Sequence, residues 1–241
     1  MTRADYLLYL ESGPKRRKTM VHVLDLLGCI ANGSTTEEAL EATPQAIRAY
    51  LRLLRRHGEA VDPEAAFETK VAEHITEGEW LGNGSPSVLF GPDLRPVSEA
   101  EVETFLNRFH GLREELASWA ATQGDEQLDA QPPGGGRTAR GVLLHVVAVP
   151  GAYLSPVLGG VSGFSRMGTL AEHGEISLAD GLRRVEAMAS ELVRATTPEQ
   201  RAAVLKRPKD VRTLRKAVRR MLEHDWEHLA ELARRPGGPA L

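Results

Sequence analysis

The chain of 241 residues contains one cysteine, Cys29, so an internal disulfide is excluded and the fold must be held by packing. The sequence also lacks a charged-then-apolar export signal at its start, and no apolar run approaches the ~18 residues that span a bilayer. The formal net charge of −3 provides no long-range attraction for nucleic acid. These absences predict a cytoplasmic protein that spans no membrane and for which nucleic acid is not an expected partner.

The composition is that of a folded globular protein, because hydrophobic residues make up 41% of the chain and charged residues 26%. The length allows two domains of ordinary size. Turn-forming residues and prolines gather between Pro92 and Pro96, where the boundary is expected. We therefore predict an α+β domain over residues 1–92 and an all-α domain over residues 97–235.

Short strand-like segments and one helix make up the first predicted domain. Alternating or β-rich segments at residues 6–10, 20–24 and 28–31 predict three strands, and residues 67–76 predict a fourth. A capping hydroxyl with a glutamate three residues on opens a helix over residues 36–57. Pro44 lies inside this helix, so a kink or break is expected there.

Four amphipathic segments make up the second predicted domain, and Gly- and Pro-rich stretches separate them. Four helices of ~20 residues predict a four-helix bundle. The segments are residues 98–121, 138–158, 177–195 and 210–234. Two basic clusters, residues 15–18 and 206–220, are interpreted as a solvated hairpin tip and a solvated helix face.

Two histidines on the last predicted helix, His224 and His228, are four residues apart and so lie one turn over the other. Both flank the apolar stripe of that helix, and Glu223 and Glu227 fall on the opposite face, which is expected to be solvated. On the second helix, apolar residues surround His145, whose imidazole should therefore point into the bundle.

A third nitrogen ligand from a neighbouring helix completes three positions around a divalent ion and leaves one open, as in catalytic zinc sites. His145, His224 and His228 are therefore candidate ligands for Zn, Ni or Fe, which neutral imidazoles suit better than Mg or Ca. The alternative is a histidine pair on a helix surface and a separate core histidine. Asp225 projects into the apolar stripe and requires a partner there, either a ligand histidine or an arginine of a neighbouring helix.

The segments at residues 138–147 (TARGVLLHVV) and 213–229 (TLRKAVRRMLEHDWEHL) resemble the second and fourth helices of DinB-like proteins. The resemblance covers about 140 residues, and the three histidines fall where that family has its metal ligands. It implies an up-up-down-down four-helix bundle, a divalent metal, often a homodimer, and hydrolase or thiol-dependent transferase chemistry. Pro150, one turn after His145, departs from the usual pattern and should kink the second helix.

The segments at residues 25–40 (DLLGCIANGSTTEEAL) and 46–51 (AIRAYL) resemble HicB-type antitoxins, which have a partial ribonuclease-H-like βββαβ fold. That resemblance covers about 70 residues, with Leu27 in place of the usual proline. It implies a surface that binds a small protein partner. The DNA-binding module that normally follows in those antitoxins is replaced here by the helical domain.

Two functions follow from these patterns. The first is a metal-dependent hydrolase or thiol-dependent transferase acting on a small molecule, with no general base identified and Cys29 excluded as nucleophile because it lies in a strand without an activating group. The second is a non-catalytic module that docks a protein partner or another copy of itself and keeps a structural metal. The substrate is not determined by the sequence.

Overall fold

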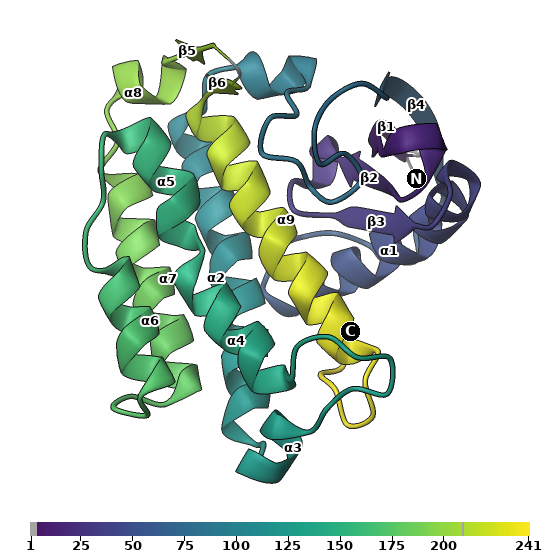
Figure 1. The fold of residues 1–241 in the computed structure, drawn as a ribbon. Helices are drawn as coiled ribbons and strands as arrows, with labels where there is room; N and C mark the ends of the chain where they lie inside the picture. The colour runs from purple at the N-terminus through teal and green to yellow at the C-terminus, as the bar shows by residue number, and fades with distance from the viewer. Residues whose placement is uncertain (1–3, 209) are drawn as a thin grey trace.

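The alternating segments at the start of the chain form one four-stranded sheet (Figure 1). Its strands lie in the order β3-β2-β1-β4, with β4 parallel to β1 and the other neighbours antiparallel. They are β1 (Ala4–Ser12), β2 (Thr19–Val23), β3 (Ile30–Gly33) and β4 (Phe67–Ile75). The computed structural model describes residues 4–208 and 210–241; residues 1–3 of the first predicted domain and Lys209 of the second basic cluster lie outside this range.

Helix α1 (Thr36–Arg56) follows β3 and packs against β2 and β3. Its start is set by the predicted cap, because the Thr35 hydroxyl accepts the Glu38 amide at 3.1 Å and the Glu38 carboxylate accepts the Ser34 amide at 2.9 Å. The helix continues through Pro44 without a break. Three strands, a helix and a fourth strand therefore follow one another in the predicted order.

The remaining elements are mainly helices. Three short 3-10 turns lie in the described part of the chain before α2. Serine or threonine caps begin α2, α4, α7 and α9, as the sequence predicted for the first three. The helices are α2 (Glu99–Ala121), α3 (Asp125–Asp129), α4 (Ala139–Ala148), α5 (Pro150–Leu158), α6 (Phe164–Glu172), α7 (Leu178–Arg194), α8 (Pro198–Ala202) and α9 (Leu214–Ala233). The 3-10 turns are η1 (Pro14–Arg16), η2 (Leu24–Leu26) and η3 (Gly91–Leu94).

One boundary in the helical part follows the prediction, and another differs from it. The second helix is divided at Pro150, whose ring and missing amide hydrogen end α4 and begin α5. The last helix begins at Leu214 and not at residue 210, because Asp210–Arg212 form strand β6, which pairs with β5 (Leu205–Arg207) as a small hairpin.

The order of helix directions also differs from the predicted up-up-down-down arrangement. Arg183 and Arg194 of α7 pair with Glu114 and Glu103 of α2, so those two helices are antiparallel. Ion pairs from α2 to α9 run in the same sense along both helices, which are therefore parallel: Glu101 with Arg215 and Arg113 with Asp225.

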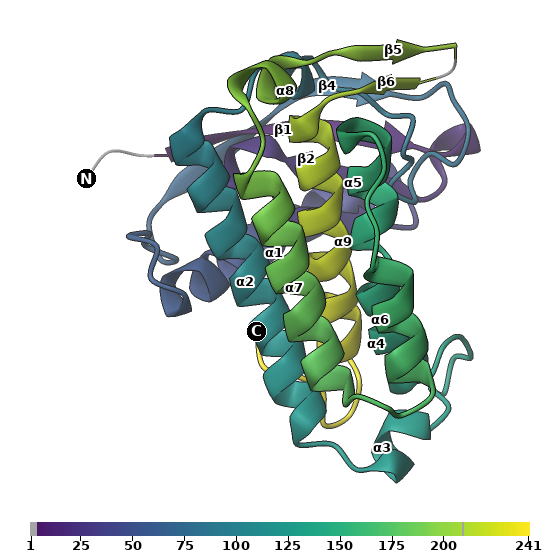
Figure 2. The same ribbon diagram turned by 90° about the vertical axis from the view of Figure 1, so that its left-hand side faces the viewer.

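The bundle is consequently up-down-down-up. Helices α4 and α5 run antiparallel to α9, and so to α2, because Arg137 before α4 bonds to Arg235 after α9, whereas Pro156 of α5 lines a pocket with Thr213 at the start of α9. Helix α6, which the sequence analysis missed, brings the chain back along α4, so that α7 starts at the same end as α4 (Figure 2).

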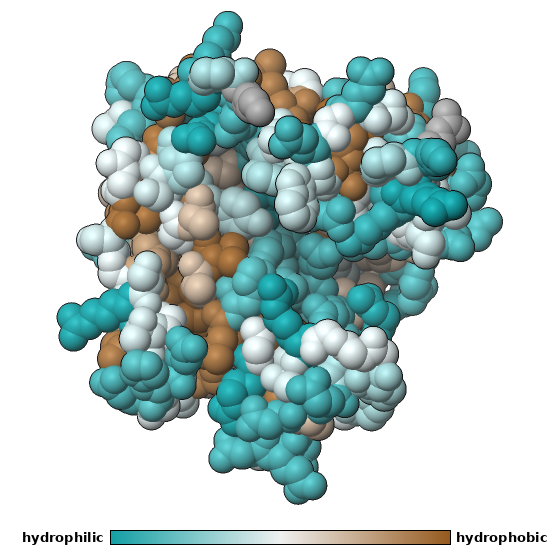
Figure 3. All heavy atoms as spheres, in the orientation of Figure 1, coloured by the Kyte–Doolittle hydropathy of each residue, from teal (hydrophilic) through white to brown (hydrophobic). Residues whose placement is uncertain are grey.

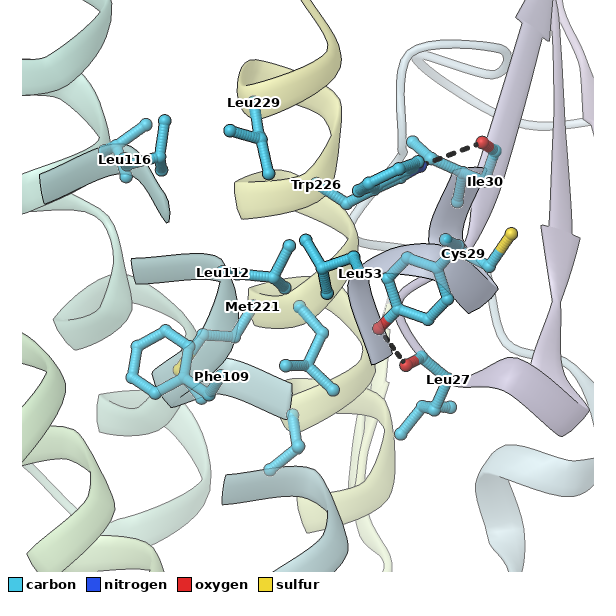
Figure 4. Packing of buried hydrophobic residues seen from close by; sticks show 14 of the residues in the cluster. Leu27, Cys29, Ile30, Leu53, Phe109, Leu112, Leu116, Met221, Trp226 and Leu229 are labelled. Carbon is cyan, nitrogen blue, oxygen red and sulfur yellow. Dashed lines mark hydrogen bonds between the residues drawn. The ribbon is translucent and has the colours of Figure 1, made fainter. Parts of the chain in front are cut away.

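Helix α9 is covered on two sides, by the bundle helices and by the sheet (Figure 1). In Figure 4, Leu112 and Leu116 of α2 lie on one side of α9 and the β3 segment on the other, where the Trp226 indole donates to the Ile30 carbonyl at 3.3 Å. One hydrophobic cluster therefore extends from the sheet into the bundle.

This placement corrects two predictions. Glu223 was expected to be solvated, but only 1% of it is exposed. The basic residues at the start of α9 were also interpreted as a solvated face, yet Arg215, Lys216, Arg219 and Arg220 are buried. Lys216 lies against β6, Arg219 against η3 and Arg220 against β2, whereas Arg215 pairs with Glu101 of α2. The reason is that the N-terminal sheet covers the face of α9 that the bundle leaves free. The described residues of the first basic cluster, Lys15, Arg17 and Lys18, are exposed as predicted.

Apolar side chains form patches among hydrophilic ones on the surface over α4 and α5 (Figure 3). Ala139–Leu158 has a mean hydropathy of 1.7 and is long enough to cross a membrane, which corrects the statement that no such run exists. Only 33% of it is buried in the protein. A core helix of a globular protein passes the same test, and Pro150 divides this one, so the run is weak support for a membrane span.

Candidate metal centre

Three histidines from two helices meet beside the α4–α5 break. His145 lies on α4, one turn before Pro150, and His224 and His228 lie one turn apart on α9. One ring nitrogen from each lies within 4.8 Å of the others, and the Nε2 atoms of His145 and His224 are 3.0 Å apart. Among the described residues these three form a group that could hold a metal ion.

Burial keeps two of these imidazoles neutral. It lowers the pKa of His145 to about 4, assisted by the positive charge that His228 and Arg137 present. Burial also lowers the pKa of His224 to about 4, although the Asp225 carboxylate opposes the shift. Near neutral pH both rings therefore offer lone pairs, which metal coordination requires.

His228 is oriented by a carboxylate on its own helix. Its Nδ1 lies 2.9 Å from Glu231 Oε2, so its Nε2 is directed away from that carboxylate. Arg235 in turn donates to the other Glu231 oxygen at 2.6 Å. The hydrogen bond from His228 lowers the pKa of Glu231 to about 2, so the carboxylate remains ionised. A carboxylate behind a histidine is the usual way in which a metal-ligating imidazole is fixed.

Asp225 pairs with an arginine of a neighbouring helix, which is one of the two partners that the sequence predicted for it. Arg113 of α2 donates to its two oxygens at 2.5 and 3.1 Å, and the same guanidinium donates to the Val146 carbonyl of α4 at 2.9 Å. Asp225 also lies 3.6 Å from Nδ1 of His224. The Asp225–Arg113 pair therefore ties together the helices that carry the histidines, α4 and α9.

The donor set fits a divalent ion of the Zn, Ni or Fe type. Two nitrogens at tetrahedral positions about such an ion are separated by roughly 3.3 Å, close to the His145–His224 separation. Nδ1 of His224 is buried without a hydrogen-bond partner, and a ring bound to a cation through Nε2 would be drawn to donate from Nδ1 to Asp225. His145 is partly exposed, which leaves an approach from solvent.

The sequence analysis missed three side chains at this site. Glu231 could have been found, because it lies three residues after His228 on the same helix face. Arg113 and Tyr153 could not, since their place depends on helix packing; the Tyr153 ring lies 6.0 Å from that of His224. Cys29 is fully buried and burial raises the pKa of its thiol, so it stays protonated.

Comparison with known proteins adds one assignment. No curated protein and no solved structure matches the chain. The DinB superfamily matches residues 108–232, which is just over half of the chain and contains all three histidines. The chain therefore belongs to the DinB superfamily.

Proposed function

We propose that the protein is a metal-dependent enzyme, a hydrolase or a transferase that uses a low-molecular-weight thiol. The observation that supports this proposal is the convergence of His145, His224 and His228, from two helices, with the neutral form favoured for the two that burial affects most. A divalent ion held there supplies a Lewis acid that polarises a substrate and lowers the pKa of a water or thiol beside it.

The residues around the histidines position them and limit access of water. Glu231 fixes the His228 ring, and the Arg113–Asp225 pair fixes the spacing of α4 and α9. Tyr153 of α5 lies beside His224 with its hydroxyl near Arg220, where it can hydrogen-bond a polar group of the substrate. A reacting thiol would come from outside the chain, because Cys29 is buried in the sheet.

Metal analysis tests the proposal directly. Elemental analysis of the purified protein should find about one Zn, Ni or Fe per chain, and His224→Ala should lose most of it. The control is His173→Ala, which removes a histidine whose side chain is 62% exposed. Equal metal content in the His224 and His173 variants, or none in the wild type, would contradict the proposal.

The second candidate is a protein-binding role for the N-terminal part, of the HicB type. The observation that favours it is strand β4, which lies at an edge of the sheet and carries the exposed side chain of Val71. An edge strand offers unpaired backbone groups to a partner strand. Affinity purification from the native host should recover a small basic partner that Val71→Lys no longer retains; recovery of the chain alone would count against this role.

We also propose that the protein is a cytoplasmic homodimer. The apolar patches over α4 and α5 are the surface that a second copy would cover. Light scattering after gel filtration should give twice the chain mass of 26.3 kDa, and Leu144→Glu should halve it. A wild-type protein at the monomer mass would exclude the dimer.

A further inference from the structure

A separate pocket opens beside the histidine cluster, at the end of the bundle where α9 begins. Its volume is about 330 Å³, which is within the range of small-molecule sites. Its apolar wall comes from α5 and from the segment before η3, through Ala152, Pro156, Val157 and Pro86. Its polar wall comes from β6 and the first turns of α9.

The polar wall carries more positive charge than its one carboxylate balances. Arg212 and Lys216 both donate to Asp210, each at 2.7 Å. Two cations therefore share one carboxylate. The first turn of α9 contains no acidic residue, so the positive end of the helix dipole adds to this excess.

Arg220 adds a third cation to the same wall. It is 3% exposed and lines the pocket, and its Nη1 donates to Glu223 at 2.5 Å. Its Nε has no hydrogen-bond partner. The carboxylate that balances the charge of Arg220 is shared, because Glu223 also accepts from Arg219 and hydrogen-bonds His22. Glu11 is a second carboxylate near Arg220. A buried guanidinium N–H without a partner is costly unless an acceptor joins it.

The pocket lies next to the histidine cluster. Both include residues of α9, and the Tyr153 side chain lies between them. Arg220 lies one helical turn before His224, a rise of roughly 6 Å. Tyr153 lines the pocket on one side, and its ring lies 6.0 Å from the His224 ring. A molecule held by one end at the start of α9 therefore extends toward the three histidines.

We propose that this pocket binds the carboxylate and the apolar body of a small acidic substrate, with Arg212, Lys216 and Arg220 as its anion-binding residues. The pocket itself does not depend on a metal. The further statement, that the reacting end of the substrate lies at the histidines, rests on the proposed function. It predicts a substrate whose acidic group and reactive centre are separated by one to two helical turns, roughly 6–12 Å.

Calorimetric titration of the metal-free protein with hexanoate, and with hexanamide as the uncharged match, tests the pocket. Hexanoate should bind at least about 10-fold more tightly, since only hexanoate carries a negative charge that pairs with these cations. Arg212→Gln, at the rim, should weaken hexanoate several-fold, and Ala152→Leu, at an exposed position of α5, should weaken both ligands by filling the pocket.

The matched control is Arg183→Gln, which removes another partly exposed arginine paired with a carboxylate, on α7. It should leave hexanoate affinity unchanged. Equal affinities for hexanoate and hexanamide, or equal losses in the Arg212 and Arg183 variants, would overturn the proposal. So would binding of hexanoate to the cobalt-loaded protein alone, because the carboxylate would then be a metal ligand.

Nuclear magnetic resonance of hexanoate with cobalt-loaded protein tests the orientation. Cobalt at the histidines should broaden the terminal methyl signal of bound hexanoate more than the signal of the methylene beside the carboxylate. The opposite order, or no broadening in a protein that has taken up cobalt, would overturn the orientation. Failure of the protein to take up cobalt would instead count against the proposed function, and the titration of the metal-free protein would still decide the pocket.

Discussion

At the level of single residues, two carboxylates lie beside the three histidines of the proposed metal site. Glu231 is the one carboxylate that hydrogen-bonds a ligand histidine at short range, 2.9 Å from His228 Nδ1, in the described part of the chain. Asp225 approaches His224 only to 3.6 Å and is bound mainly by Arg113. The two carboxylates therefore have different roles, the first in orienting a ligand and the second in joining helices.

Glu231→Gln should weaken metal binding by about 10- to 100-fold, because the amide no longer fixes the His228 tautomer or increases its basicity. Competition with a chromophoric chelator measures the affinity. The control is Glu227→Gln on the same helix, whose carboxylate only approaches Asn32 at 3.4 Å. The role of Glu231 would be refuted by an equal effect of the two substitutions, once circular dichroism shows that both variants are folded.

The neutral histidines also make the metal-free protein less stable in acid. The folded-state pKa of His145 and of His224 is about 4, below the ordinary value of 6.5, so between these values the unfolded chain binds more protons than the folded one. The free energy of unfolding should therefore fall as the pH decreases through this window. Urea titrations in the presence of a chelator measure it. His224→Gln should show a shallower pH dependence than His173→Gln; parallel curves would contradict this assignment.

The residues that could be predicted from the sequence are those whose position depends on one helix. The spacing of His224 and His228 and the apolar surroundings of His145 follow from helical periodicity, and the structure brings these residues together. The sequence predicted that Asp225 pairs with either a ligand histidine or an arginine, but it did not identify which residue. Arg113 lies on a helix more than a hundred positions earlier, so its position beside Asp225 depends on how the helices pack. Tyr153 was missed for the same reason.

At the level of elements, α9 supports both the sheet and the metal site. On its sheet side, Glu223 accepts from Arg219 and Arg220 and hydrogen-bonds His22 of β2 at 2.7 Å. Arg219 also pairs with Asp93 of η3. The residue after Glu223, His224, points to the bundle side and enters the histidine cluster. A change in this buried network should therefore affect the stability of the fold and also the placement of His224.

Glu223→Gln should lower the free energy of unfolding by about 3 kcal/mol, since it removes the carboxylate that pairs with Arg220 and leaves Arg219 with Asp93 alone. An arginine side chain stays charged at any accessible pH, so loss of a proton cannot remove this cost. Urea unfolding at neutral pH measures it, with Glu227→Gln as the control on the same helix. A loss no larger than that of the control would show that the network contributes little.

The element boundaries were predictable where a cap or a proline determines them. Thr35, Ser98 and Ser177 begin helices as their cap positions predicted, and Pro150 interrupts a helix. The up-down-down-up order was not predictable, because it depends on α6, a short helix between glycine-containing turns. The burial of Glu223 was missed because the amphipathic pattern of α9 was interpreted with one apolar face, whereas the helix has a second, ionic interface.

At the level of the whole molecule, the sheet and the bundle share one hydrophobic cluster. Leu222 and Trp226 of α9 are 0% and 2% exposed, and the Trp226 indole donates a hydrogen bond to the Ile30 carbonyl of β3. Without the N-terminal part, these apolar groups and the ionic network around Glu223 would meet water. The domain boundaries at residues 92 and 97 stay a prediction. The interface between the two parts, however, consists of buried hydrophobic residues, as a domain core does.

The whole chain should therefore unfold in one cooperative step. The helical signal in circular dichroism and the tryptophan fluorescence, to which Trp226 at the interface contributes, should give superimposable urea transitions, because loss of either part removes the buried surface of the other. The fragment of residues 97–241 should show less helix per residue than the full chain and should aggregate. Two separate transitions, or a soluble fragment with undiminished helix that still binds metal through His145, His224 and His228, would show that the bundle folds alone. The sheet would then be an attached module and not a structural part of the site.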